Sequence, residues 1–292
     1  MIAYLVNLAT LVAIFGIAAA SMNLLIGYAG IFSLAHGVFF GIGAFTAAQI
    51  ALKISPDLLL AFAGAAALSV ALSLCLALPA LRVRGEYFIA ASLGLQMFAV
   101  TVFYEAHSLT GGHGGLAGIP QATLLGISVG TPWRFLGVAS VTLVLCLLLI
   151  RTLMRGSFGR ALTAMRDAES AAMAFGKNIP LLKTLAVAVG CGMVGIAGAL
   201  FAFHISFVNG DSFTLEQSVL LQAMVIIGGA GTLAGPLVGA LLILLLPAAL
   251  TFLPFIPATE IGTVQQFIYG AAMTLLMIFR PGGIAGQHAG RR

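Results

Sequence analysis

Long apolar segments dominate the sequence, and their length points to a chain that spans a membrane. A helix needs about 20 residues to cross the ~30 Å hydrocarbon core of a bilayer. Apolar stretches of roughly this length lie near residues 3–26, 34–52, 58–81, 86–104, 133–151, 181–206, 217–230, 235–254 and 262–279. Because 217–230 is short and glycines interrupt 28–37, about eight crossings with a re-entrant segment remain an alternative to nine.

Charged residues are too scarce for a soluble domain. They make up 7% of this chain, whereas a soluble globular domain has about 25%. The sequence therefore predicts an all-α integral membrane protein, a polytopic helical bundle of about 8–9 transmembrane helices with glycine-broken segments. We expect it to form a single transmembrane domain over residues 1–292. The net charge of +5 is no sign of nucleic-acid binding, because no basic stripe lies outside the loops and the C-terminal tail.

One polar segment, residues 151–183, interrupts the apolar pattern. An ionised side chain costs several kcal/mol in hydrocarbon, so the segment is expected in water, and its excess of Arg and Lys predicts the cytoplasmic side. Ser157 is a candidate cap for the start of a short helix, and Gly176 a candidate for its end. The apolar face predicted for this helix comprises Leu162, Met165, Ala172, Met173 and Gly176. Such a face is suited to contact with another protein, although most charged loops between spans are only solvated connectors.

The distribution of basic residues predicts an orientation. With nine crossings and the polar segment inside, only Lys53 and Arg134 of the 13 basic residues lie outside. This arrangement places the N-terminus and a loop over 105–132 outside, and a C-terminal tail over 280–292 in the cytoplasm. Trp133 then begins the fifth span at the outer interface, where amphipathic rings are common.

Glycines occur in two arrangements, a ridge of small residues on one predicted helix and two segments that break predicted helices. The ridge Cys191, Gly195 and Ala199 is expected to pack closely against another helix. Two glycine-broken segments, 29–37 and 230–236, resemble each other, and interrupted helices at matching places in two halves indicate a transport path. An internal duplication and a chance match both remain open.

The predicted spans contain uncharged polar residues but no central charge. Without intramembrane Asp, Glu, Lys or Arg, the spans offer no obvious group to couple an ion gradient, so energy for active transport would enter through the polar segment. We see no catalytic, nucleotide-binding or metal-binding motif. The candidate residues for a solute path are Asn23, Ser33, His36, Ser92, Gln96 and Gln222, together with Gly231 and Gly235 of the second broken segment. A lone His such as His36 is more often a hydrogen-bonded structural residue than a ligand.

Four sequence stretches match a family pattern, and they follow one another in the expected order over nearly the whole chain. They are NLLIGYAG at 23–30 with its continuation to 44, LRVRGEYF at 81–88, GRAL at 159–162 with its continuation to 176, and GGAGTLAGP at 228–236 with FRPGG at 279–283. In these stretches the chain resembles the LivM-type membrane subunit of ABC importers for branched-chain amino acids. Ser170 stands where the importer EAA-x₃-G signature has Glu. Gly114 stands where the family's TGG-x-x-GL pattern often has an acidic or amide residue.

The resemblance implies a role for the polar segment and a set of partners. Residues 152–180 would be the cytoplasmic coupling loop that docks on an ATPase subunit. The coupling residues implied are Gly159, Arg160, Leu162, Arg166, Glu169, Ala172 and Gly176. The partners would be a second permease subunit, two cytoplasmic ATPase subunits that bind ATP and Mg, a periplasmic solute-binding protein and the bilayer of the bacterial inner membrane.

Three function hypotheses follow from these observations. The first is a non-enzymatic permease subunit of an ATP-binding-cassette importer for branched-chain amino acids, or for a related small neutral or zwitterionic solute. The second is a passive channel or facilitator for small neutral solutes such as urea or short amides, which composition alone fits equally well. The third is an assembly subunit without a path. The sequence does not fix the solute or whether like or unlike permeases pair.

Overall fold

The computed structural model describes residues 2–80, 86–250, 261–279 and 282–285. The first half contains α1 (Ile2–Asn23), the π-helical segment η1 (Leu24–Ala29), α2 (His36–Lys53), α3 (Leu58–Ala80), α4 (Glu86–Glu105), α5 (His107–Thr110), the 3₁₀ turn η2 (Gly112–Gly114) and strands β1 (Leu116–Ala117), β2 (Thr123–Leu124) and β3 (Ile127–Ser128). The second half contains α6 (Pro132–Arg155), α7 (Ser157–Asp167), α8 (Glu169–Ala174), α9 (Ile179–Ile205), β4 (Phe207–Val208), the 3₁₀ turn η3 (Gly210–Phe213), α10 (Leu215–Gly228), α11 (Gly235–Leu250) and α12 (Ile261–Phe279).

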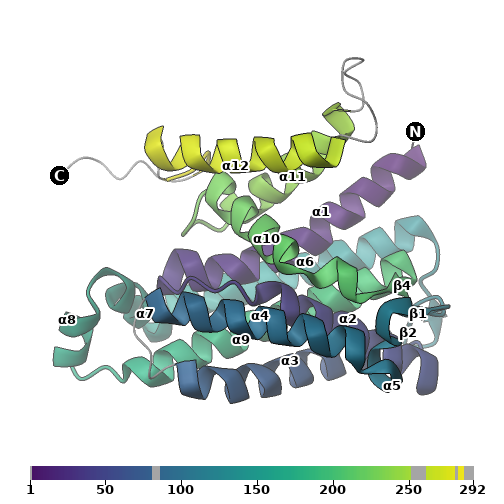
Figure 1. Cartoon of the computed structure of the whole chain (residues 1–292), viewed down its shortest axis with the longest axis horizontal. Helices are drawn as coiled ribbons and strands as arrows, with labels where there is room; N and C mark the ends of the chain where they lie inside the picture. Colours follow the sequence, from purple (N-terminus) through teal and green to yellow (C-terminus); the bar gives the residue numbers. More distant parts are fainter. Residues whose placement is uncertain (1, 81–85, 251–260, 280–281, 286–292) are drawn as a thin grey trace.

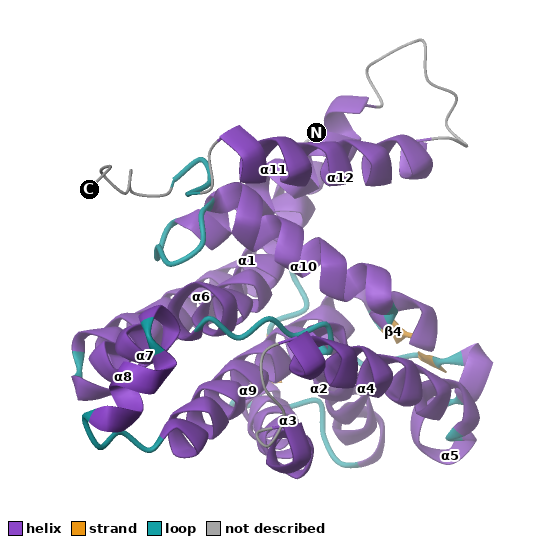
Figure 2. Cartoon of the chain, turned by 60° about the vertical axis from the view of Figure 1, so that its left-hand side comes forward, coloured by secondary structure: helices purple, strands orange, loops and turns teal. Residues whose placement is uncertain are grey.

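The described residues confirm the predicted all-α membrane fold. Among them, four helical segments are long and apolar enough to cross a bilayer: Ile2–Ala29, Tyr87–Glu105, Pro132–Arg155 and Ile179–Ile205. α10 has 14 residues and is about 21 Å long at 1.5 Å per residue, which is less than a ~30 Å core. The seventh stretch is therefore short, as expected, and α10 runs obliquely to its neighbours (Figure 2).

The two ends of the bundle differ. In Figure 1, α7 and α8 lie at one end, and α5 and the short strands lie at the other, where α1 also begins. β1 pairs with β4, which ties the loop 105–132 to the connection between α9 and α10. At the α7 end, the backbone N–H groups of Ile284 and Ala285 donate to Ile227 and Gly228 at the end of α10. The assignment of these ends to the cytoplasm and the outside stays a prediction.

Part of the predicted topology falls on residues that the structure does not describe. Arg82 and Arg84 of the LRVRGEYF stretch and Arg280 of the FRPGG stretch lie outside the described residues, as does most of the predicted tail 280–292.

Close packing of α2 against α9 forms the centre of the bundle. A Cβ on Gly43 would overlap the carbonyl of Gly195, and a Cβ on Gly198 would overlap the carbonyl of Phe40. The predicted small-residue ridge is thus buried, with Cys191 1% exposed and Ala199 fully covered. Backbones that approach this closely gain dispersion contacts that larger side chains would prevent, which is how helices associate in lipid.

Candidate functional site

In the structure the first glycine-broken segment also includes η1, so it runs from Leu24 through a π-helical turn and irregular backbone into the first turn of α2 at Gly37. η1 ends at Gly30, whose φ of 69° lies in the left-handed region, and α2 begins only at His36. A break leaves backbone N–H groups without helical partners, and inside a bundle other side chains must supply them. The Ser92 hydroxyl of α4 accepts from Leu34 N at 2.9 Å, and the Ser218 hydroxyl of α10 accepts from Gly37 N at 2.8 Å.

Two amide side chains extend this hydrogen bonding to α10 and η3. Gln96, with no exposed surface, donates to the carbonyl of Phe213 at 2.8 Å and accepts from the Ser218 hydroxyl at 3.1 Å. Gln222 donates to the carbonyl of Ser33 at 3.5 Å. We name the group the central polar cluster: Ser33, His36, Ser92, Gln96, Ser218 and Gln222. Five of its six members were predicted as path residues. Ser218 was missed, although it lies one turn before Gln222 on the same face of α10.

His36 is a buried residue with a hydrogen bond of its own. Its side chain is 1% exposed and its Nε2 lies 2.7 Å from the Ser21 hydroxyl oxygen. The same Ser21 hydroxyl lies 2.7 Å from the carbonyl of Ala18. His36 therefore joins α1 to the start of α2. Its place in a solute path stays a prediction.

The second glycine-broken segment lies directly against the first. Asn23, at the end of α1, donates through Nδ2 to the carbonyl of Thr232 at 2.8 Å and accepts through Oδ1 from Gly231 N at 2.8 Å. A Cβ on Gly27 would overlap the Gly231 amide, and Gly231 itself has a φ of 79°. Gly235 starts α11, where a Cβ would overlap the carbonyl of Gly229. The structure thus brings Asn23, Gly231 and Gly235 together, at a contact separate from the central polar cluster.

The polar segment forms two helices, and the prediction of one helix with an open apolar face is wrong. Ala168 has φ −156° and ψ 89°, which ends α7 before α8 begins. Gly156, and not Ser157, occupies the N-cap position. Gly176 does end α8, as predicted, with φ 74° and the Lys177 N–H bonded to the Ala172 carbonyl.

The apolar residues of α7 pack against their own chain and are not available to a partner. Leu162 is fully buried, Met165 is 3% exposed and Ala172 in α8 is 4% exposed. They share a cluster with residues of the first broken segment and of α9: Leu24, Leu25, Ala29, Ile31, Ile179 and Ala186. An amphipathic helix beside membrane helices buries its apolar face against them first. The apolar residues left exposed here are Met173, at 52%, and Phe175, at 84%.

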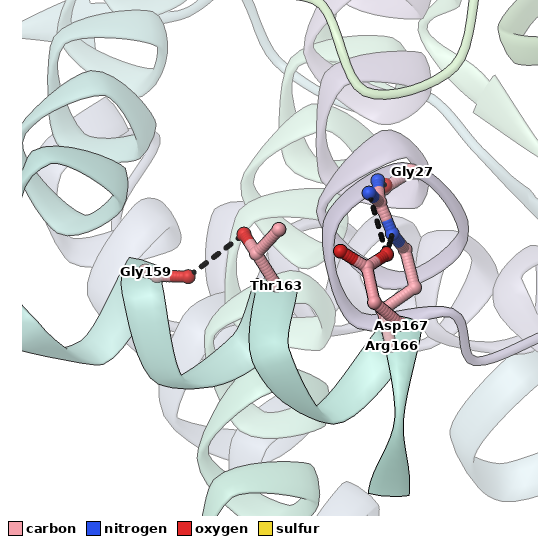
Figure 3. A network of polar contacts seen from close by, with 5 residues as sticks. All are labelled: Gly27, Gly159, Thr163, Arg166 and Asp167. Atoms are coloured by element: carbon pink, nitrogen blue, oxygen red, sulfur yellow. Dashed lines mark hydrogen bonds and ion pairs between the residues drawn. The ribbon is translucent and has the colours of Figure 1, made fainter. Parts of the chain in front are cut away.

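Arg166 connects the polar segment to the first broken segment. Its Nη1 donates to the carbonyl of Gly27 at 2.7 Å, while Nε and Nη2 lie 2.9 Å from Oδ1 of Asp167 (Figure 3). The arginine stem lies over Gly30, where a Cβ would meet its Cγ at 2.8 Å. A charge-assisted hydrogen bond to a helix-end carbonyl is among the stronger ones in proteins. Arg166 therefore holds η1 to the end of α7.

The other predicted coupling residues have local roles in this structure. Gly159 allows α7 to approach the end of α6, since a Cβ there would overlap the carbonyl of Met154. Arg160 is exposed and donates to the carbonyl of Arg155 at 3.2 Å. Glu169 pairs with Lys183 at 2.8 Å on the surface, and such an exposed pair contributes little to stability. The described residues contain no group of His, Cys, Asp and Glu side chains that could hold a metal ion.

Residues 4–279, which include both broken segments and the polar segment, match a family model described as the permease component of the branched-chain amino acid transport system. The chain belongs to this permease family. It is a multi-pass membrane protein, and the transport-permease class predicted for it is confirmed.

Individual relatives of this permease carry related descriptions. It is 28% identical to the high-affinity branched-chain amino acid transport system permease protein LivM of Salmonella typhimurium strain LT2, over 96% of this chain and 69% of the relative. The LivM protein of Escherichia coli K12 gives the same figures. The autoinducer 2 import system permease protein LsrC of Salmonella paratyphi B is 30% identical, over 50% of this chain and 43% of the relative. No solved structure matches the chain significantly.

Proposed function

We propose that this permease is the membrane-spanning subunit of an ATP-driven importer of branched-chain amino acids, or of a related small neutral or zwitterionic solute. It would work with a second permease subunit, two cytoplasmic ATPase subunits that bind ATP and Mg, and a periplasmic solute-binding protein in the bacterial inner membrane. The proposal agrees with the family, and with relatives whose names describe branched-chain amino acid transport. The relative named for autoinducer 2 import leaves other solutes open to test.

The observation that carries the proposal is a continuous series of contacts from the polar segment to both helix breaks. Arg166 binds Gly27 in the first broken segment, and Asn23, one turn earlier, binds Gly231 and Thr232 in the second. Movement of α7 would therefore act on both breaks together. The first break also supplies the backbone groups that the central polar cluster binds, so the same movement would change that cluster.

The polar cluster fits a solute that is neutral or zwitterionic. Its side chains are hydroxyl, amide and imidazole groups, which offer hydrogen bonds without a fixed charge. In the conformation described, these groups bond to one another, to the backbone and, in the case of His36, to the hydroxyl of Ser21. A solute would have to replace these bonds when α1, α4 and α10 separate, which is a way to couple solute passage to helix movement.

Docking of an ATPase subunit on this permease would use a different surface from the predicted one. With Leu162 and Met165 buried, the exposed Phe175 and Met173 at the end of α8 remain. A large aromatic side chain that is 84% exposed beside Lys177 suits an anchor in a partner pocket.

The test is leucine uptake and ATP hydrolysis by the reconstituted complex. Arg166→Ala is expected to leave ATP hydrolysis active but to uncouple it, so that uptake per ATP falls at least tenfold. Thr163→Ala is the matched control, because Thr163 lies on the same helix and its hydroxyl donates only to the carbonyl of Gly159 within α7. Unchanged coupling in Arg166→Ala would contradict the proposal. Leucine flux through liposomes that contain this chain alone would instead support a passive facilitator.

A further inference from the structure

A long apolar groove lies on the side of the bundle, away from the central polar cluster. Its walls come from α6, from α3 and α9, and from the β2–β3 hairpin, and its volume is 640 Å³. Along α6 it extends from Arg134 to Leu149, which is about 22 Å at 1.5 Å per residue. It therefore covers more than one leaflet of a ~30 Å hydrocarbon core. Val141 and Leu145, in the groove, are 59% and 61% exposed.

The interior of the groove has almost no polar group to offer a solute. The hydroxyl of Thr142 donates to the carbonyl of Val138 at 2.9 Å within α6. Arg134 is the one charged lining residue, and it lies at the end of the groove next to the hairpin. An amino acid or other polar solute would leave its own polar groups unpaired here, which costs several kcal/mol in apolar surroundings. The groove is therefore suited to hydrocarbon.

The charged end of the groove lies where lipid headgroups are expected. Trp133, the single tryptophan of the chain, precedes Arg134 and is 63% exposed. Tryptophan gathers at the membrane–water interface, so this end of α6 marks headgroup depth. Arg134 uses Nη1 to donate to the Ser128 carbonyl at 3.2 Å, and within the described residues it forms no ion pair. A guanidinium has five donors, which leaves several for a phosphate.

The charge at the end of the groove favours a phospholipid over an apolar helix. The phosphate of a lipid is an anionic partner for the guanidinium of Arg134, whereas an apolar helix would offer it none. A second apolar groove, of 660 Å³, lies between α2, α3 and α4 and also has a basic residue, Lys53, at its end. Lys53 and Arg134 are also the only basic residues that the sequence assigns to this side of the membrane. Each of them ends an apolar groove.

We propose that the α6 groove is a seat for a phospholipid of the leaflet at the Trp133 end. One acyl chain lies in the groove along Gly137, Val141 and Leu145, and the phosphate binds Arg134. The lipid would fill the space between α6 and α3. It would also stabilise the β2–β3 hairpin, because Arg134 would bind both the phosphate and the carbonyl of Ser128 in β3.

The experiment measures retained phosphatidylglycerol on the purified full-length chain by native mass spectrometry. Arg134→Gln is expected to weaken retention about tenfold, through loss of a charge-assisted contact. Gly137→Phe, which fills the groove, is expected to remove one bound lipid. Gly94→Phe on α4 is the matched control, since both glycines are exposed, neither has an atom within 4 Å of an added Cβ, and Gly94 lines neither groove. Gly94→Phe should retain lipid as the unmodified chain does.

Three results would overturn the inference. Retention equal to the unmodified chain in both Arg134→Gln and Gly137→Phe would show that the groove holds no lipid. Equal retention of dioleoylglycerol, which has the chains without the phosphate, would remove the role of Arg134. Loss of binding to a second permease subunit in Gly137→Phe, with lipid unchanged, would make the groove a subunit interface.

Discussion

Replacement of Asn23 by Ala would test whether the two glycine-broken segments act as one unit. Asn23 makes two 2.8 Å hydrogen bonds to a loop more than 200 residues away in the sequence, one to Gly231 N and one to the carbonyl of Thr232. A buried polar group left unpaired costs about 1–3 kcal/mol. Gly231 and Thr232 are only half-buried, so water can replace part of each bond. We therefore expect Asn23→Ala to lower the free energy of opening this contact by about 2 kcal/mol.

Hydrogen exchange of the Gly231 amide reports this loss directly, since that N–H is the donor to Asn23. A local opening made easier by about 2 kcal/mol accelerates exchange about 30-fold. Thr10→Ala is the control, because Thr10 is 1% exposed on the same helix but bonds only to the carbonyl of Val6. Exchange of Gly231 within threefold of the unmodified chain would refute the reasoning, as would equal acceleration in Thr10→Ala.

Three further changes have defined outcomes. Gly198→Ala forces a Cβ into the α2 backbone and should lower unfolding stability in detergent by about 1–3 kcal/mol, whereas Gly270→Ala, with open space around it, should not. Ser218→Ala removes the acceptor for a buried amide at the start of α2 and should lower the free energy of unfolding by about 1–3 kcal/mol, against less than about 1 kcal/mol for Thr46→Ala, whose hydroxyl bonds to the carbonyl of Ile42 within α2. Phe175→Ala should leave thermal stability unchanged but weaken pull-down of the ATPase subunits several-fold; equal pull-down would exclude Phe175 as an anchor.

The sequence predicted the helices and the broken segments well because hydrocarbon imposes strict local rules. Apolar length decides which segments can cross, and glycines of positive φ lie at both breaks: Gly30 caps η1 and Gly231 lies in the loop between α10 and α11. The polar residues inside spans also had to find partners, so selecting them by type identified five members of the central polar cluster. Ser218 was missed because a single serine in an apolar helix is common and only its neighbours give it importance.

The polar segment shows where pattern reasoning fails. The periodicity of Leu162 and Met165 predicts an apolar face, but periodicity does not say what covers that face. In the structure the chain's own η1 and α9 cover it, and Ala168 interrupts a helix that composition alone would continue. Arg166 was chosen for its place in a family pattern, and only the fold shows that it binds the carbonyl of Gly27.

The sequence alone determined which segments are apolar enough for hydrocarbon and which need water, because the free-energy cost of burying a charge or exposing apolar surface is set by each residue. What the tertiary structure decided is which segments share a contact. Asn23 reaches Gly231 across more than 200 residues, and Ser92 and Ser218 meet one helix break from two different helices. Those pairings depend on how the helices pack against one another, and no local pattern in the sequence specifies which helices will be in contact.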